Sequence, residues 1–207
     1  MTSVKPLWKI NEINRRTFFT QSVGYTAGLT LLTFPGIITE VLAAKGDKSK
    51  EEIFKELEEK AGKYALMYGC AQGSFRALNE QFKLNADNKI SRALMPFTGG
   101  MMRGETCGAV SGSLLALGFF FESLNQKGKK TAGSSIKLGG MFCDRFEKEF
   151  GSTRCKEVVK HQYGRYYDAR NPEELKLFME VAQKSGKCTE VVKKAVFIAG
   201  DIFLENS

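Results

Sequence analysis

The sequence predicts an all-α protein, with a single compact multi-helix domain of six to eight helices around a central buried helix. Three observations lead to this prediction. Hydrophobic residues make up 43% of the 207 residues and recur every three or four positions in several stretches. Proline occurs only four times. No stretch alternates apolar and polar residues between turn signals, as a half-buried strand would.

The domain opens with a helix whose start is marked by a capping box. Ser49 and Glu52 have the S-x-x-E spacing in which each side chain satisfies a backbone N–H of the other. Apolar residues follow with the helical repeat until Gly69 interrupts them. We expect a second helix to start at or just before Cys70, and a short third helix to end at Pro96.

Further helices fill the rest of the domain. Residues 98–105 are expected to form a loop, and residues 107–123 a helix that is apolar on most sides and too short to span a bilayer. Residues 138–150 carry apolar side chains every four positions and form another helix. Asn171, followed by proline and two glutamates, marks the start of the next. A final helix covers about residues 187–204.

The N-terminal residues 1–44 have the order of a bacterial export signal. Arg15 and Arg16 precede a moderately apolar run that ends in small residues, and the arginine pair is typical of a twin-arginine signal. A polar linker, 45–52, leads into the helical domain, 53–207. We therefore expect a periplasmic or extracytoplasmic protein that contacts the membrane only through this signal. An uncleaved signal serving as an anchor and a cytosolic amphipathic helix are the alternatives.

The charge pattern predicts no nucleic-acid partner. The net charge is +8, but the lysines are scattered and mixed with glutamates. The densest basic cluster, residues 126–130, has the composition of a loop. We interpret most of this charge as a solvated surface.

The five cysteines do not form a known short metal or redox motif. They are Cys70, Cys107, Cys143, Cys155 and Cys188, and no two of them are separated by only two residues. This spacing argues against zinc ribbons, thioredoxin-type pairs and covalent c-type haem. Because the number is odd, at least one thiol is free, a metal ligand or bridged to another chain.

Four of these cysteines fall at predicted helix starts. Residues 152–160 and 185–193 share the pattern S-x-[KR]-C-x-E-V-V-K, with serine as the candidate N-cap and cysteine three positions later. Unpaired N–H groups at a helix start, and neighbouring basic residues, favour the thiolate. Cys107 and Cys70 also lie at predicted helix starts, so the same effects are expected to favour their thiolates. Cys143 lies within a helix and is expected to pack in the core.

Small residues recur every four positions in the helix that follows Cys107. Gly104, Gly108, Gly112 and Ala116 form a stripe without side-chain bulk. Such a stripe lets another backbone, or a bound group, approach closely. We expect Gly108 and Gly112 to contact either a neighbouring helix or a cofactor.

Four segments stand in the order typical of one protein family: CAQGSFRALNE, TGGMMRGETCGAVSGSLLALG, FEKEFGSTRCKEVV and CTEVVKKA. They resemble the C-GCAxxG-C-C family of redox-active proteins over about residues 55–204. Its C-G-A-x-x-G motif corresponds to residues 107–112. The resemblance implies that the four characteristic cysteines are Cys70, Cys107, Cys155 and Cys188. A related domain occurs in split-Soret cytochromes, which are thought to hold an iron–sulfur centre, but this chain lacks C-x-x-C-H and implies no covalent haem.

The expected function is that of an exported redox protein with an unidentified partner. Either pairs of cysteines exchange thiols and disulfides, or all four hold an iron–sulfur cluster that transfers electrons. The alternative is a non-catalytic helical module that binds an exported partner and uses its cysteines structurally. A hydrolase that pairs Cys107 with His161 lacks an evident third, orienting residue.

Overall fold

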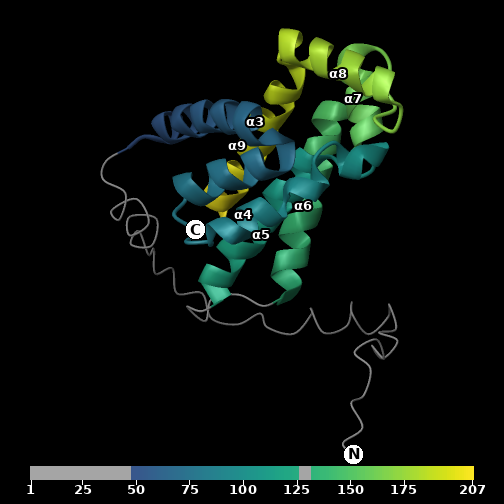
Figure 1. Ribbon diagram of the computed structural model, residues 1–207. Helices are drawn as coiled ribbons and strands as arrows, with labels where there is room; N and C mark the ends of the chain where they lie inside the picture. The colour runs from purple at the N-terminus through teal and green to yellow at the C-terminus, as the bar shows by residue number, and fades with distance from the viewer. Residues whose placement is uncertain (1–47, 126–131) are drawn as a thin grey trace, which may run out of the picture. The chain divides into compact units, whose positions relative to one another are not determined.

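The computed structural model describes residues 48–125 and 132–207, and within these ranges it contains seven α-helices and no strand (Figure 1). The all-α prediction is confirmed. The export signal and the basic cluster predicted at 126–130 lie outside the described residues. No described helix is both long enough and apolar enough to cross a membrane. The helices are α3 (Lys50–Gln81), α4 (Asn88–Ala93), α5 (Gly108–Asn125), α6 (Ala132–Phe150), α7 (Cys155–Tyr163), α8 (Pro172–Ser185) and α9 (Lys187–Glu205).

Helix α3 begins and bends where the sequence predicts. The Ser49 hydroxyl accepts a hydrogen bond from the Glu52 N–H at 3.2 Å, and the Glu52 carboxylate accepts one from the Ser49 N–H at 2.9 Å. Gly69 then adopts φ 78° and ψ 178°, which interrupts the helix, so a new helical segment starts at residue 70. A Cβ added to Gly73 would lie 2.9 Å from the Ala65 Cα, so the two segments of α3 pack closely at this kink.

The core lies where α3, α5, α6 and α9 pack against one another (Figure 1). Large aromatic side chains fill it. The rings of Phe120 and Phe203 stack with centroids 4.2 Å apart, and Phe142 and Phe146 are fully buried along one face of α6. Burying one such side chain stabilises a fold by about 1.5–3 kcal/mol. These contacts hold the helix starts that carry the cysteines.

The starts of α7 and α9 differ from the prediction in one detail. Ser152 and Ser185 were expected to be the N-caps, but the caps are Arg154 and Gly186. Each serine hydroxyl instead accepts a hydrogen bond from the N–H two residues later, at 3.0 Å in α7 and 3.4 Å in α9. A serine side chain can form such a local turn in place of a cap, and this places each cysteine inside the first helical turn.

Candidate functional site

One cavity of about 320 Å³ brings four cysteines together. Its walls come from the kink of α3, the segment 98–102, and parts of α7, α8 and α9. Cys70, Cys107, Cys155 and Cys188 all line it, whereas Cys143 lies on α6 and is not among the lining residues. The remaining walls are mainly apolar and include Val158, Val159, Leu175, Phe178, Val191 and Val192.

A short antiparallel bridge holds the starts of α5 and α7 side by side. The Cys107 N–H donates to the Thr153 carbonyl at 2.8 Å, and the Cys155 N–H donates to the Glu105 carbonyl at 2.5 Å. These two hydrogen bonds hold the chain segments of Cys107 and Cys155 side by side, with Cys107 opposite Thr153 and Cys155 opposite Glu105. A bridge this short has no alternating pattern, so sequence periodicity could not reveal it.

A left-handed turn forms another wall of the cavity. Residues Gly99, Gly100, Met101 and Met102 have φ values of 66°, 60°, 57° and 56°. The two methionines occupy a conformation that costs a non-glycine residue about 1–2 kcal/mol. A Cβ added to Gly100 would lie 2.8 Å from the Cβ of Cys155, so the turn packs directly against the start of α7. The sequence predicted only a loop here.

Cys70 sits at the new helical start created by the kink of α3. Burial raises the pKa of its thiol. Backbone N–H groups of Ala71, Gly99 and Gly108 point towards the sulfur and lower this pKa in part. A Cβ on Gly108 would lie only 2.4 Å from the Cys70 Sγ. A Cβ on Gly112 would lie 2.1 Å from the Ala71 carbonyl oxygen. Gly108 therefore adjoins a cavity sulfur, whereas Gly112 allows close packing between α5 and α3.

The expectation that these thiols are unusually acidic is wrong. Burial raises the pKa of all four, to about 12 for Cys155 and well above the ordinary value for Cys107. N–H groups at the start of α5 oppose this effect at Cys107, but desolvation is larger. Nearby thiolates would also repel one another, which raises the pKa of Cys155 further. The reduced cavity thus holds neutral thiols.

Tyr163, at the end of α7, contacts Cys188. The Cys188 N–H donates to the Tyr163 hydroxyl oxygen at 3.1 Å, and that hydroxyl also hydrogen-bonds the Cys188 side chain. Burial raises the pKa of Tyr163 to about 12, so the hydroxyl keeps its proton. Tyr163 belongs to a group of tyrosines close together in the sequence, with Tyr166 and Tyr167. Nothing in their spacing indicates this contact, because Cys188 lies 25 residues away.

The Thr98 side chain adds an unpaired polar group to this cavity. Its Oγ1 is buried and has no hydrogen-bond partner, although Thr98 lines the cavity. A buried hydroxyl without a partner costs about 1–3 kcal/mol. Such a group is more stable when a bound group supplies the missing hydrogen bond.

No disulfide is present among the described residues: all five cysteines are free thiols. Within the same ranges, no three Cys, His, Asp or Glu side chains are placed to hold one metal ion. His161 is exposed, hydrogen-bonds the Gln162 side chain and is not among the residues that line the cavity. The residues that could hold a cofactor are therefore the four cysteines of the cavity.

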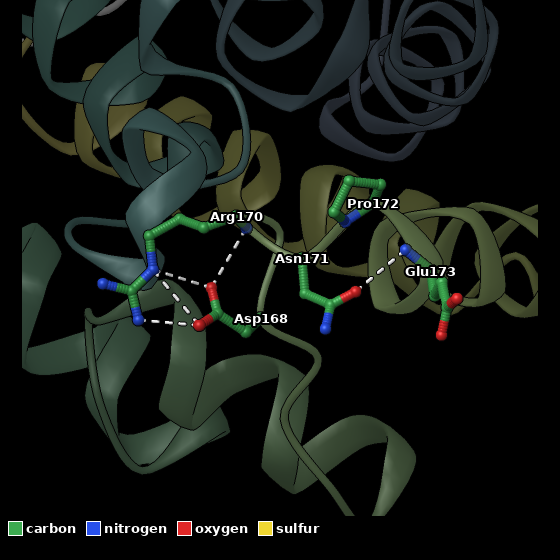
Figure 2. A pocket seen from close by; sticks show the side chains of 5 residues that line it. All are labelled: Asp168, Arg170, Asn171, Pro172 and Glu173. Carbon is green, nitrogen blue, oxygen red and sulfur yellow. Dashed lines mark hydrogen bonds and ion pairs between the residues drawn. The ribbon is translucent and has the colours of Figure 1, made fainter.

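A separate hollow at the start of α8 has a structural role. It is lined by Asp168, Arg170, Asn171, Pro172 and Glu173 (Figure 2). The Arg170 guanidinium donates to the Asp168 carboxylate at 2.7 Å and lowers the pKa of that carboxyl to about 2. The Asn171 side chain accepts from the Glu173 N–H at 2.9 Å, which caps α8 as predicted. The polar groups of this hollow thus pair with one another.

The helices and the cavity define an all-α protein whose cysteines converge from several helix starts. The sequence model of one family, described as "Putative redox-active protein (C_GCAxxG_C_C)", matches residues 68–202, more than half of the chain. The chain belongs to this family, and the predicted resemblance is confirmed. The search of curated proteins and the search of solved structures each found no match.

Proposed function

We propose that this protein transfers electrons through an iron–sulfur cluster held by Cys70, Cys107, Cys155 and Cys188. The observation that carries the proposal is the meeting of these four cysteines, from four separate helical starts, in one cavity. Four thiolates are the usual ligand set of such clusters. The cysteines of such a cluster would be shared among more than one iron atom, so they need not meet at a single point.

Three features of the cavity fit a bound cluster. Its walls are mainly apolar, which favours a soft, sulfur-ligated group. Backbone N–H groups around Cys70 and at the start of α5 are placed to stabilise negative charge on sulfur. The unpaired Thr98 hydroxyl is available to a bound group.

The chain's own residues would bind the cluster and influence its reduction potential. When bound, the cluster supplies one-electron chemistry that the side chains lack. The four thiols are neutral in the reduced cavity, so each must release a proton to become a ligand. Met102, Leu66 and Met179 line the cavity and are exposed at the surface, so a partner protein would reach the site along this side.

A second form of the redox function is thiol–disulfide exchange between Cys107 and Cys155. The antiparallel bridge places their two chain segments side by side, and repulsion from a Cys155 thiolate contributes to the raised pKa of Cys107, which supports this pair. Two thiols would give one disulfide, two protons and two electrons, and a disulfide of the partner protein would accept both electrons and protons. The raised thiol pKa values slow this reaction near neutral pH, because the thiolate is the attacking group.

Purification of the full chain without oxygen tests the cluster. We expect visible absorption together with bound iron and acid-labile sulfide. Replacing any one of the four cavity cysteines by serine should remove most of the iron, while Cys143→Ser, on α6 outside the cavity, should retain it. If the purified protein contains no iron and no sulfide, the cluster is excluded. If a Cys107–Cys155 disulfide then forms after mild oxidation, thiol–disulfide exchange is supported. If it does not form, the result supports the non-catalytic helical module.

We also propose that residues 1–44 export the folded protein. The arginine pair supports this, because the twin-arginine route carries folded cargo, often with its cofactor already bound. Arg15→Lys combined with Arg16→Lys should keep the protein in the cytoplasm in a cell-fractionation assay. Unchanged periplasmic recovery of this variant would exclude the twin-arginine route.

A further inference from the structure

Cys155 and Cys188 occupy the same sequence motif but have different surroundings. Both follow a serine whose hydroxyl accepts a hydrogen bond from the N–H two residues later. Burial and repulsion between thiolates raise the pKa of Cys155, and no hydrogen bond opposes them. Cys188, in contrast, contacts the Tyr163 hydroxyl. The repeated motif thus provides two sulfurs of unequal environment.

The hydroxyl of Tyr163 lies among polar groups at the start of α9. Its oxygen accepts from the Cys188 backbone N–H at 3.1 Å, and the Ser185 hydroxyl and the Cys188 sulfur are its other polar neighbours. A tyrosine hydroxyl has two acceptor positions and one donor proton. Because the backbone N–H occupies an acceptor position, the proton remains available to an acceptor, and the Cys188 sulfur is within reach.

Neighbouring side chains hold the ring of Tyr163 in this position. The ring packs edge-on against Phe178 of α8, with centroids 5.7 Å apart, and against Tyr167 at 6.4 Å. The Lys187 ammonium lies 5.4 Å from the ring centroid and donates to the Gln162 carbonyl at 2.6 Å. The hydroxyl therefore keeps its place at Cys188 without needing a bound group.

We propose that Tyr163 is a positioning residue of the redox site, whose hydroxyl donates a hydrogen bond to the Cys188 sulfur and raises the reduction potential of the site. This inference rests on the proposed redox function. Reduction of a bound cluster adds negative charge, which its sulfur ligands share. A hydrogen-bond donor stabilises that charge, so it favours the reduced state.

The test compares Tyr163→Phe with Tyr68→Phe in the full chain purified without oxygen. Tyr163→Phe removes the hydroxyl and keeps the ring, and should weaken the reduced state about tenfold, which is about 59 mV for a one-electron couple. Tyr68→Phe removes the hydroxyl of a tyrosine that does not line the cavity and should leave the midpoint potential unchanged.

A second readout uses the reduced, metal-free protein. Alkylation followed by mass spectrometry should show Cys188 reacting several-fold more slowly in Tyr163→Phe, with the rate at Cys155 unchanged as an internal reference. If the wild-type protein has a redox couple and Tyr163→Phe leaves both its potential and the Cys188 rate unaltered, the role of Tyr163 is refuted and the redox function stands. If the wild-type protein shows no redox couple, the redox function fails, and this proposal fails with it.

Discussion

Gly108, the first residue of α5, lies directly against the sulfur of Cys70. A Cβ at position 108 would come within 2.4 Å of the Cys70 Sγ, which is too close for a carbon and a non-bonded sulfur. The glycine of the C-G-A-x-x-G motif thus allows a cysteine from α3 to reach the cavity beside Cys107. This contact joins two helical starts that are distant in the sequence.

Gly108→Ala should destabilise the metal-free protein and disrupt the cavity. The added methyl group has to displace the Cys70 sulfur or separate α5 from α3, and such overpacking costs about 1–3 kcal/mol. Urea unfolding should therefore show a lower free energy of unfolding, and iron incorporation should fall with it.

Gly118→Ala, on the same helix, is the matched control. A Cβ at position 118 would meet nothing within 4 Å, so this variant should be as stable as the wild type or more stable by about 1 kcal/mol. Equal stabilities for the two variants would contradict the contact between Gly108 and Cys70.

The stability of the reduced, metal-free protein should fall at alkaline pH. The folded thiols have raised pKa values, about 12 for Cys155, so they stay protonated after the thiols of the unfolded chain ionise near about pH 8.5. The stability that these protonated thiols contribute is fully present below that pH. It decreases by about 1.4 kcal/mol per pH unit for each such thiol until the folded pKa is reached.

Urea unfolding between about pH 7 and about pH 10 measures this effect. Cys155→Ser should show a shallower decline than the wild type, because serine does not ionise in this range. Cys143→Ser removes a thiol outside the cavity whose pKa is also raised by burial, and tests whether the cavity thiols dominate. Stability that rises with pH in the wild type would show that the folded thiols are acidic.

Thr98→Val should have opposite effects on the metal-free and the loaded protein. Valine has nearly the same shape as threonine and fits the extended backbone at position 98, but it removes the buried hydroxyl that has no partner. The metal-free protein should gain about 1 kcal/mol in thermal or urea unfolding. The loaded protein should lose iron to a chelator faster, since a hydrogen bond to the bound group is lost. A stabilising effect in both forms would exclude that hydrogen bond.

Met101→Gly should stabilise the protein. Met101 has φ 57° and is 37% exposed, so glycine relieves backbone strain without leaving a buried space. We expect a net gain of about 0.5–1 kcal/mol, because the greater backbone entropy of glycine offsets part of the relief. Met179→Gly, at an exposed position within α8, should instead lose about 1 kcal/mol. Thermal unfolding of the two variants distinguishes strain from simple loss of an exposed side chain.

Local signals in the sequence predicted the helices accurately. The capping box at Ser49, the break at Gly69 and the cap at Asn171 all act through neighbouring backbone groups, so they can be recognised without knowledge of the fold. The predicted starts near Cys107 and Cys188 lie within a residue or two of the observed ones for the same reason. The cap positions of α7 and α9 were wrong, because serine formed a local turn instead, and α6 begins at Ala132, before the apolar repeat that predicted it.

The sequence by itself determined the all-α architecture, the helix limits and the position of four cysteines at helix starts, because these depend on side chains a few residues apart. Only the tertiary structure decided that the four meet in one cavity, that their thiols are neutral and that Tyr163 contacts Cys188. The pKa of a thiol depends on how much water surrounds it in three dimensions. Here burial outweighs the helix N-terminus and the neighbouring basic residues, which were the effects visible along the chain.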